Sequence, residues 1–237
     1  FEADELEEVK ERFFREAETA GRLSHRNIVT IYDEGDEHDL AYIAMEFLKG
    51  ENLSKYIKAD TLLPIKQVLS LIQRSAGGID YAHQHNVVHR DIKPANIMWD
   101  RKSDTLKITD FGIARITDSS KTKTGMVLGT PSYMSPEQLA GKKVTGQSDI
   151  FSLGVMLFQM VTGKLPFTGD SMASLMYKIA NEAHPSPESI NPNIPRCVTV
   201  IINRAMAKDI DKRYQRGSEM VADINKCLKI IEVESRS

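Results

Sequence analysis

Cysteine is scarce in this sequence. Cys197 and Cys227 are the two cysteines among 237 residues, and they lie far apart, outside any metal-binding motif. So few thiols argue against a disulfide framework and against a zinc site built from cysteine. They also fit a protein of a reducing compartment.

Neither an excess of one charge nor a long apolar run is present. The 31 Lys and Arg residues nearly balance the 33 Asp and Glu residues, so no global field would attract nucleic acid or an anionic membrane. The most apolar stretch, residues 150–161, is too short to cross a bilayer. The acidic, amphipathic N-terminus is not typical of a secretory signal. We therefore expect no nucleic-acid partner and no membrane contact for this chain, with any anchor outside it.

The composition is that of an ordinary globular protein, with 41% hydrophobic and 27% charged residues. Apolar residues at three- and four-residue steps predict an amphipathic helix from Leu6 to Leu23. Two strand-like runs follow at residues 27–34 and 40–47, and turn-prone residues between them predict a hairpin.

The rest of the chain predicts a mostly helical body. Pro64 suits the first turn of a helix that runs to about His85. Residues 148–162 are apolar on nearly every face, which predicts a helix buried on all sides, and Gly163 is placed to end it. Residues 110–137 have little periodicity and form a long predicted loop, which in a compact domain is usually functional.

Three motifs in fixed order carry the chemistry. They are H-R-D-I-K-P-A-N at residues 89–96, D-F-G at 110–112 and G-T-P-S-Y-M-S-P-E at 129–137. Together they resemble the protein kinase family, with Ser135 replacing the Ala of its A-P-E motif. The resemblance covers essentially the whole chain and implies an α+β, protein-kinase-like fold.

The resemblance also implies a division of the chain. Residues 1–47 would form a partial small lobe with one helix and two strands. Residues 48–237 would form an intact, mostly helical large lobe that contains the catalytic loop and the activation loop, residues 110–137. The cofactors implied are ATP and Mg²⁺, and the substrates are Ser and Thr hydroxyls of proteins.

The motif positions assign the catalytic roles by resemblance. Asp91 would orient the acceptor hydroxyl and take its proton, and Lys93 would contact the transferred phosphate, as in Ser/Thr kinases. Asn96 and Asp110 would hold Mg²⁺, which prefers oxygen ligands. The alternative is an ordinary enzyme in which these residues form a polar loop whose groups are all hydrogen-bonded.

The nucleotide site would continue into the segment after the second strand. There Met45 matches the gatekeeper of the hinge, and the backbone groups of Glu46 and Leu48 would bond the adenine edge. A plain strand end is the alternative. Glu16 resembles the helix glutamate that pairs with a lysine of the small lobe, although Glu11 and Glu18 are rivals on other faces of the same helix.

Further matches are structural. His89 and Phe111 would stack into the apolar spine that links the lobes, together with residues 20 and 31. Asp149 would brace the backbone of the catalytic loop. Glu137 and Arg213 would form a buried ion pair. A metal site at His83, His85 and His89 is rejected. His83 and His85 are predicted at a helix end, where exposed imidazoles are common, and no matching carboxylate or cysteine pattern follows.

Arg90 directly precedes the catalytic aspartate, which by resemblance indicates control by phosphorylation of the 110–137 loop. Arg90 and Arg115 could bind the added phosphate; an unregulated Ser/Thr-rich loop is the alternative. Thr130 would contact Asp91 and Lys93 instead of acting as the switch. The candidate phosphorylation sites are Ser119, Ser120, Thr122 and Thr124.

The sequence departs from the family at its start. No Gly-rich loop and no V-A-I-K lysine precede Glu16, so we expect the first small-lobe strands to be deleted or disordered. Uncovered apolar surface would then favour a homodimer or strand exchange. We also expect this chain alone to transfer phosphate poorly or not at all.

The motifs look most like those of bacterial kinases of the eukaryotic type, many of which carry this domain on the cytoplasmic side of a membrane anchor. The predicted function is therefore an ATP-dependent Ser/Thr protein kinase of bacterial signalling. A non-catalytic binding module on the same fold is the first alternative. A small-molecule phosphotransferase is the second. Residues 129–137 argue against it, because the matching stretch shapes a peptide-docking platform in protein kinases.

Overall fold

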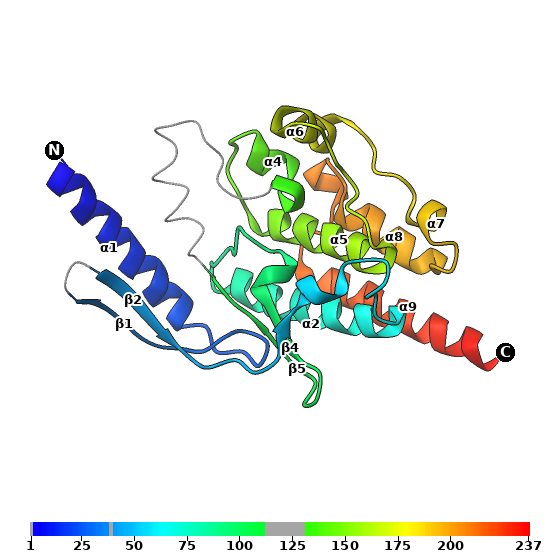
Figure 1. Cartoon of the computed structure of the whole chain (residues 1–237), viewed down its shortest axis with the longest axis horizontal. Helices are drawn as coiled ribbons and strands as arrows, with labels where there is room; N and C mark the ends of the chain where they lie inside the picture. Colours follow the sequence, from blue (N-terminus) through cyan, green and yellow to red (C-terminus); the bar gives the residue numbers. More distant parts are fainter. Residues whose placement is uncertain (1, 38–39, 112–130) are drawn as a thin grey trace.

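The computed structural model describes residues 2–37, 40–111 and 131–237. Within them, one helix and one hairpin lie at one end of the molecule, and a helical body lies at the other (Figure 1). The strands are β1 (Ile31–Glu37), β2 (Leu40–Met45), β3 (Glu51–Asn52), β4 (Ile97–Asp100) and β5 (Thr105–Ile108). The α-helices are α1 (Glu2–Gly21), α2 (Ile65–Gln84), α4 (Pro136–Leu139), α5 (Gly146–Thr162), α6 (Met172–Asn181), α7 (Pro187–Ile190), α8 (Arg196–Ala205) and α9 (Gly217–Arg236).

The predicted hairpin is confirmed. β1 and β2 pair antiparallel, with Ile31 opposite Met45 and Glu37 opposite Leu40. The pairing therefore extends as far as Glu37, into the segment from Gly35 onward that the sequence predicts as the turn. Helix α1 is also confirmed and packs against β1. Its apolar residue Leu6 is 57% exposed.

A second small sheet connects this end of the molecule to the body. β4 pairs antiparallel with both β3 and β5. Ile28 forms a parallel bridge with Ile108, and the Asn27 carbonyl accepts a hydrogen bond of 2.8 Å from the N–H of Ile108. The Asn27 side chain donates to the Leu106 carbonyl at 3.0 Å. The segment before β1 is thus fixed to the strand that leads into the D-F-G motif.

Helix α5 forms the centre of the body, as predicted. Its residues from Ser148 to Thr162 are all buried, and it packs against α2 and α8. Gly163 ends the helix with φ 78°, a left-handed conformation that glycine adopts without strain. A Cβ there would lie 2.7 Å from the backbone nitrogen of Ala59, so the position has no room for a side chain.

The two cysteines form a disulfide. Cys197 on α8 and Cys227 on α9 are bonded, with their Cα atoms 5.5 Å apart. The sequence argument against a disulfide is wrong for this pair, and its support for a reducing compartment falls with it. The reason is that α8 and α9 pack side by side, which brings together two residues 30 positions apart in sequence.

None of the helices in the described part of the chain combines the length and the apolar character needed to cross a bilayer.

Candidate active site

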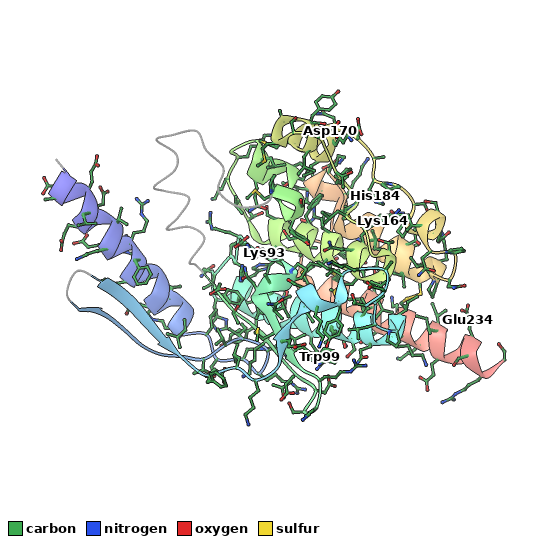
Figure 2. The ribbon with its side chains drawn as sticks, viewed as in Figure 1. Lys93, Trp99, Lys164, Asp170, His184 and Glu234 are labelled. Atoms are coloured by element: carbon green, nitrogen blue, oxygen red, sulfur yellow. A yellow bond between two sulfur atoms is a disulfide. The ribbon has the colours of Figure 1, made fainter. Side chains whose placement is uncertain are left out.

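The catalytic loop lies between α2 and β4 and brings three of the predicted residues together. The Asn96 amide nitrogen donates to the Asp91 carbonyl at 2.7 Å and to its carboxylate Oδ2 at 3.3 Å. The Lys93 ammonium lies 3.4 Å from the same Oδ2. Figure 2 shows Lys93 on the side of the helical body that faces α1 and the hairpin.

Asp110 is held beside this loop through its neighbour Thr109. The backbone N–H of Thr109 donates to the Asn96 carbonyl at 2.8 Å, and its hydroxyl donates to the same carbonyl at 3.1 Å. The hydroxyl also lies 3.3 Å from the Asp110 carboxylate. Asp110 itself has φ 63°, in the left-handed region. These bonds place the two expected metal ligands at one end of β5.

The backbone of the catalytic loop is strained and braced. Arg90 has φ 76°, and a non-glycine residue in this region persists only where its surroundings hold it. The Asp149 carboxylate, 1% exposed, accepts the N–H of His89 at 2.8 Å and that of Arg90 at 2.9 Å. The brace predicted for Asp149 is thus present as a pair of hydrogen bonds.

His83 belongs to this brace, and the sequence did not predict it. Its Nε2 lies 2.7 Å from Asp149 Oδ2, and its side chain is 15% exposed. Assigning His83 to an exposed helix end was wrong, because α2 turns this position toward α5. A signal was available: His83 lies four residues after the inward-facing Ile79, on the same helical face.

The environment of Asp149 keeps it ionised. Burial raises the pKa of its carboxyl, but the hydrogen bond with His83 and the N–H of Arg90 together lower the pKa below its usual value. An anion at this place is the form that can accept both backbone N–H groups.

The side chains of His83, His85 and His89 contact different groups and do not converge on one point. His85 Nδ1 lies 2.9 Å from the Tyr81 carbonyl, and His89 Nε2 lies 2.6 Å from the Thr109 carbonyl. Within residues 2–37, 40–111 and 131–237, no group of three or more His, Cys, Asp or Glu side chains is placed to hold a metal ion.

His89 and Phe111 stack in the core. Their rings meet edge to face with centroids 4.6 Å apart, and both side chains are buried. Ile31 packs against the same core. This contact joins the catalytic loop to the D-F-G motif in the way the resemblance implied.

Glu137 and Arg213 form the predicted ion pair. Arg213 Nη1 lies 2.5 Å from Glu137 Oε1 and Nη2 lies 3.1 Å from Oε2, and Ser148 donates to Oε1 at 2.7 Å. Burial raises the pKa of Glu137, but Arg213 and the Ser148 hydroxyl lower it by more. The pKa of Glu137 therefore lies below its usual value. The pair fixes the start of α4 to the segment before α9.

The segment predicted as the hinge lies against the β4–β5 hairpin. The Glu46 N–H donates to the Thr30 carbonyl at 2.9 Å, and its carboxylate accepts from the Thr30 N–H at 2.8 Å and lies 3.3 Å from the Lys107 ammonium. Desolvation raises the pKa of Glu46, but the Thr30 and Lys107 interactions lower it below its usual value. A cavity of ≈ 200 Å³ opens here, lined by Glu46, Phe47, Leu48, Lys49, Met98, Asp100, Ser103, Thr105 and Lys107.

Part of the predicted site cannot be placed. Glu16 lies in α1 and Met45 ends β2, but their side chains are not among those described. The expected regulatory residues of the 110–137 loop lie outside the described residues, namely Arg115, Ser119, Ser120, Thr122, Thr124 and Thr130.

The elements and the site define the class of the protein. A helical body joined to a small mixed part, with Asp91 and Asn96 in one loop and Asp110 at the next strand end, has the α+β protein-kinase-like fold. The family model described as "Protein kinase domain" matches residues 2–230, and the chain belongs to that family.

Two relatives from bacteria are similar to most of the chain. The chain is 45% identical over 214 residues to serine/threonine-protein kinase PrkC of Bacillus subtilis, covering 90% of this chain and 33% of that protein. It is 40% identical over 225 residues to probable serine/threonine-protein kinase PknB of Lactococcus lactis, with 94% and 35% covered. It matches the crystal structure of the PknI kinase domain of Mycobacterium tuberculosis with a TM-score of 0.72, at 28% identity, over 92% of this chain and 79% of that one. The chain spans about a third of the length of these curated relatives.

Proposed function

We propose that the protein containing this chain is a Ser/Thr protein kinase that transfers the γ-phosphate of ATP to Ser and Thr hydroxyls of protein substrates. The observation that carries the proposal is the network in which Asp91 contacts Lys93 and Asn96, and Thr109 links Asn96 to Asp110. Phosphoryl transfer depends on positioning and charge stabilisation more than on covalent chemistry, and this network supplies both.

In this proposal Asp91 orients the acceptor hydroxyl and takes its proton. Lys93, 3.4 Å from Asp91 Oδ2, is placed to contact the transferred phosphate. The chemistry of Asn96 and Asp110 fits Mg²⁺, because an amide oxygen and a carboxylate are ligands that the ion prefers. The Asn96 amide nitrogen donates to Asp91, and the Asn96 Oδ1 is the atom that would bind the metal. When bound, Mg²⁺ neutralises the charge of the phosphates.

The adenine would bind backbone groups of Glu46 and Leu48 at the proposed hinge, and both residues line the same cavity as Met98. Residues 1–47 would act as a partial small lobe and residues 48–237 as the large lobe. We also propose that phosphorylation within residues 110–137 raises activity, with Arg90 and Arg115 binding the new phosphate. Ser119, Ser120, Thr122 and Thr124 remain the predicted sites.

The relatives PrkC and PknB are named serine/threonine-protein kinases and come from bacteria. We therefore propose a role in bacterial signalling, with this domain on the cytoplasmic side of a membrane anchor. Self-association through α1 and the hairpin stays a prediction, and the exposed Leu6 is consistent with it. Sedimentation of the chain at several concentrations would test it.

The test of the function is phosphate transfer from γ-labelled ATP in the complete protein that carries these residues, with Asp91→Asn as the control. Loss of the general base should lower kcat by about 10²–10⁴-fold. Equal rates for the two proteins would overturn the proposal. Residues 1–237 alone should transfer poorly, since they contain neither a Gly-rich loop nor a V-A-I-K lysine; turnover near the usual range of roughly 1–100 per second would contradict that.

The absence of these two motifs from the 237 residues favours one second candidate for the isolated chain, a non-catalytic binding module on the kinase fold. Nucleotide affinity with and without Mg²⁺ separates the candidates. A catalytic kinase should bind ATP more tightly with the metal, and an Asp110→Asn change should remove the difference. A binding module would show no such dependence.

A further inference from the structure

The peptide unit that joins Arg90 to Asp91 is bonded at both of its ends. Its N–H, on Asp91, donates to His89 Nδ1 at 3.1 Å. Its carbonyl, on Arg90, accepts from the side-chain amide of Gln138 at 3.0 Å. Asp149 holds the preceding peptide through the N–H of Arg90. Rotation of the plane next to the catalytic aspartate would therefore break at least one of these bonds.

Gln138 reaches the loop from α4 and uses its two amide atoms for different partners. The oxygen accepts the N–H of Ser135 at 3.1 Å and so completes the capping box of α4. The nitrogen donates to Arg90. Gln138 is half-buried, and its neighbour Glu137 is anchored by Arg213. The Gln138 amide is thus carried by the start of α4, and the Glu137–Arg213 ion pair fixes the position of that helix.

We propose that Gln138 is a positioning residue for phosphate transfer: by donating to the Arg90 carbonyl it fixes the direction in which the Asp91 side chain leaves the backbone. This inference rests on the proposed function. Arg90 has φ 76°, a conformation that relaxes when its surroundings release it. Asp149 restrains the N–H side of this residue and Gln138 restrains the carbonyl side. Because α4 belongs to the segment expected to bind peptide, the same contact couples the substrate platform to the catalytic aspartate.

Two substitutions separate the two roles of Gln138. Gln138→Glu keeps an oxygen for the Ser135 N–H but replaces the donor with an oxygen that faces the Arg90 carbonyl. Gln138→Lys keeps a donor within reach of that carbonyl but loses the acceptor for Ser135. Gln73→Glu, on the exposed side of α2 where it bonds Asn225, is the matched control for the change in charge.

Steady-state kinetics of the complete protein provide the first measurement. Misplacing a catalytic group costs up to about 10²-fold in rate. We expect Gln138→Glu to lower kcat by about 10–100-fold with KM for ATP within about twofold, and Gln138→Lys and Gln73→Glu to lose less than about fivefold. A residue that only caps α4 would give the opposite order, with Gln138→Lys the more impaired variant, and that order would overturn the inference.

Amide hydrogen exchange provides a second measurement that needs no activity. Exchange of the peptide covering residues 88–96 should speed up by about tenfold or more in Gln138→Glu and stay near the wild-type rate in Gln138→Lys. If the wild type transfers no phosphate, the proposed function fails while the exchange result still decides this contact. Unchanged exchange in Gln138→Glu would refute the positioning role.

Discussion

The buried pair of Glu137 and Arg213 allows a prediction whose size and pH dependence both follow from the structure. The Arg213 side chain is 0% exposed and, besides Glu137, it donates to the carbonyls of Gln147 and Ala207 at 2.9 Å each. Arg213→Met retains much of the aliphatic stem that packs in the core. It leaves the Glu137 carboxylate with the Ser148 hydroxyl as its remaining side-chain donor in the described part of the chain.

The expected cost at neutral pH is large. Removing one partner of a buried ion pair destabilises a protein by about 3–5 kcal/mol, because the other charge stays buried without compensation. For a chain of this length each kcal/mol corresponds to about 2–4 °C in melting temperature. Arg213→Met should therefore melt roughly 6–20 °C below the wild type.

The cost should also shrink in acid. In the wild type the pKa of Glu137 lies below its usual value. The stability that the ionised Glu137 contributes is therefore fully present at a pH above the usual pKa, and it is lost as pH falls through the lowered pKa. Without Arg213, the Ser148 hydroxyl remains to offset burial in part, and burial raises the folded-state pKa, so the variant loses stability as pH rises through that raised value. The stability gap between the two proteins should thus be wider at pH 8 than at pH 5.

Urea unfolding followed by fluorescence suits this measurement. Trp99 is the sole tryptophan of the sequence and is 2% exposed, so its emission reports unfolding of the body. The double variant Glu137→Gln, Arg213→Met removes both charges and should recover part of the lost stability with little dependence on pH. A gap below about 1 kcal/mol at pH 8, or one of equal size at pH 5, would refute the reasoning.

Two further predictions concern the body. Reduction of the Cys197–Cys227 disulfide should lower the melting temperature by about 4–16 °C, because such a bond typically contributes about 2–4 kcal/mol. Cys197→Ser should melt at the lower temperature with no further response to reductant. An intact mass that shows two free thiols in the oxidised protein would contradict the disulfide. Asp149→Asn should lower kcat and stability together, because an amide cannot accept both the N–H of His89 and that of Arg90 and still pair with His83. Hydrogen exchange should locate the loosening at residues 88–96, and unchanged exchange there would speak against the brace.

Local patterns predicted much of the fold. The hairpin, α2 and α5 follow from apolar spacing and turn residues within a few positions of one another. The motifs placed Asp91, Lys93 and Asn96 in one loop, because short spacing within a loop leaves them little freedom to separate. The stop at Gly163 was visible because a helix end needs a left-handed residue.

The unpredicted features depend on contacts between distant segments. His83 meets Asp149 across 66 positions, Gln138 meets Arg90 across 48, and the cysteines bond across 30. Nothing in the local sequence of any partner specifies the other, since helix packing creates the proximity. Gln138 was visible as a capping residue after Ser135, but its second partner depends on where α4 lies against the loop.

The contacts described for the catalytic loop come from one part of the molecule. Asp149 comes from α5, His83 from α2, Gln138 from α4, and Thr109 and Phe111 follow β5. The proposed hinge at Glu46 instead lies beside Thr30 and Lys107. The position of Asp91 should therefore depend on the folding of the body, and nucleotide affinity on the packing of the hairpin. It follows that Thr30→Pro, which removes the N–H that Glu46 accepts, should raise KM for ATP in the complete protein far more than it lowers kcat, whereas Gln138→Glu should do the reverse.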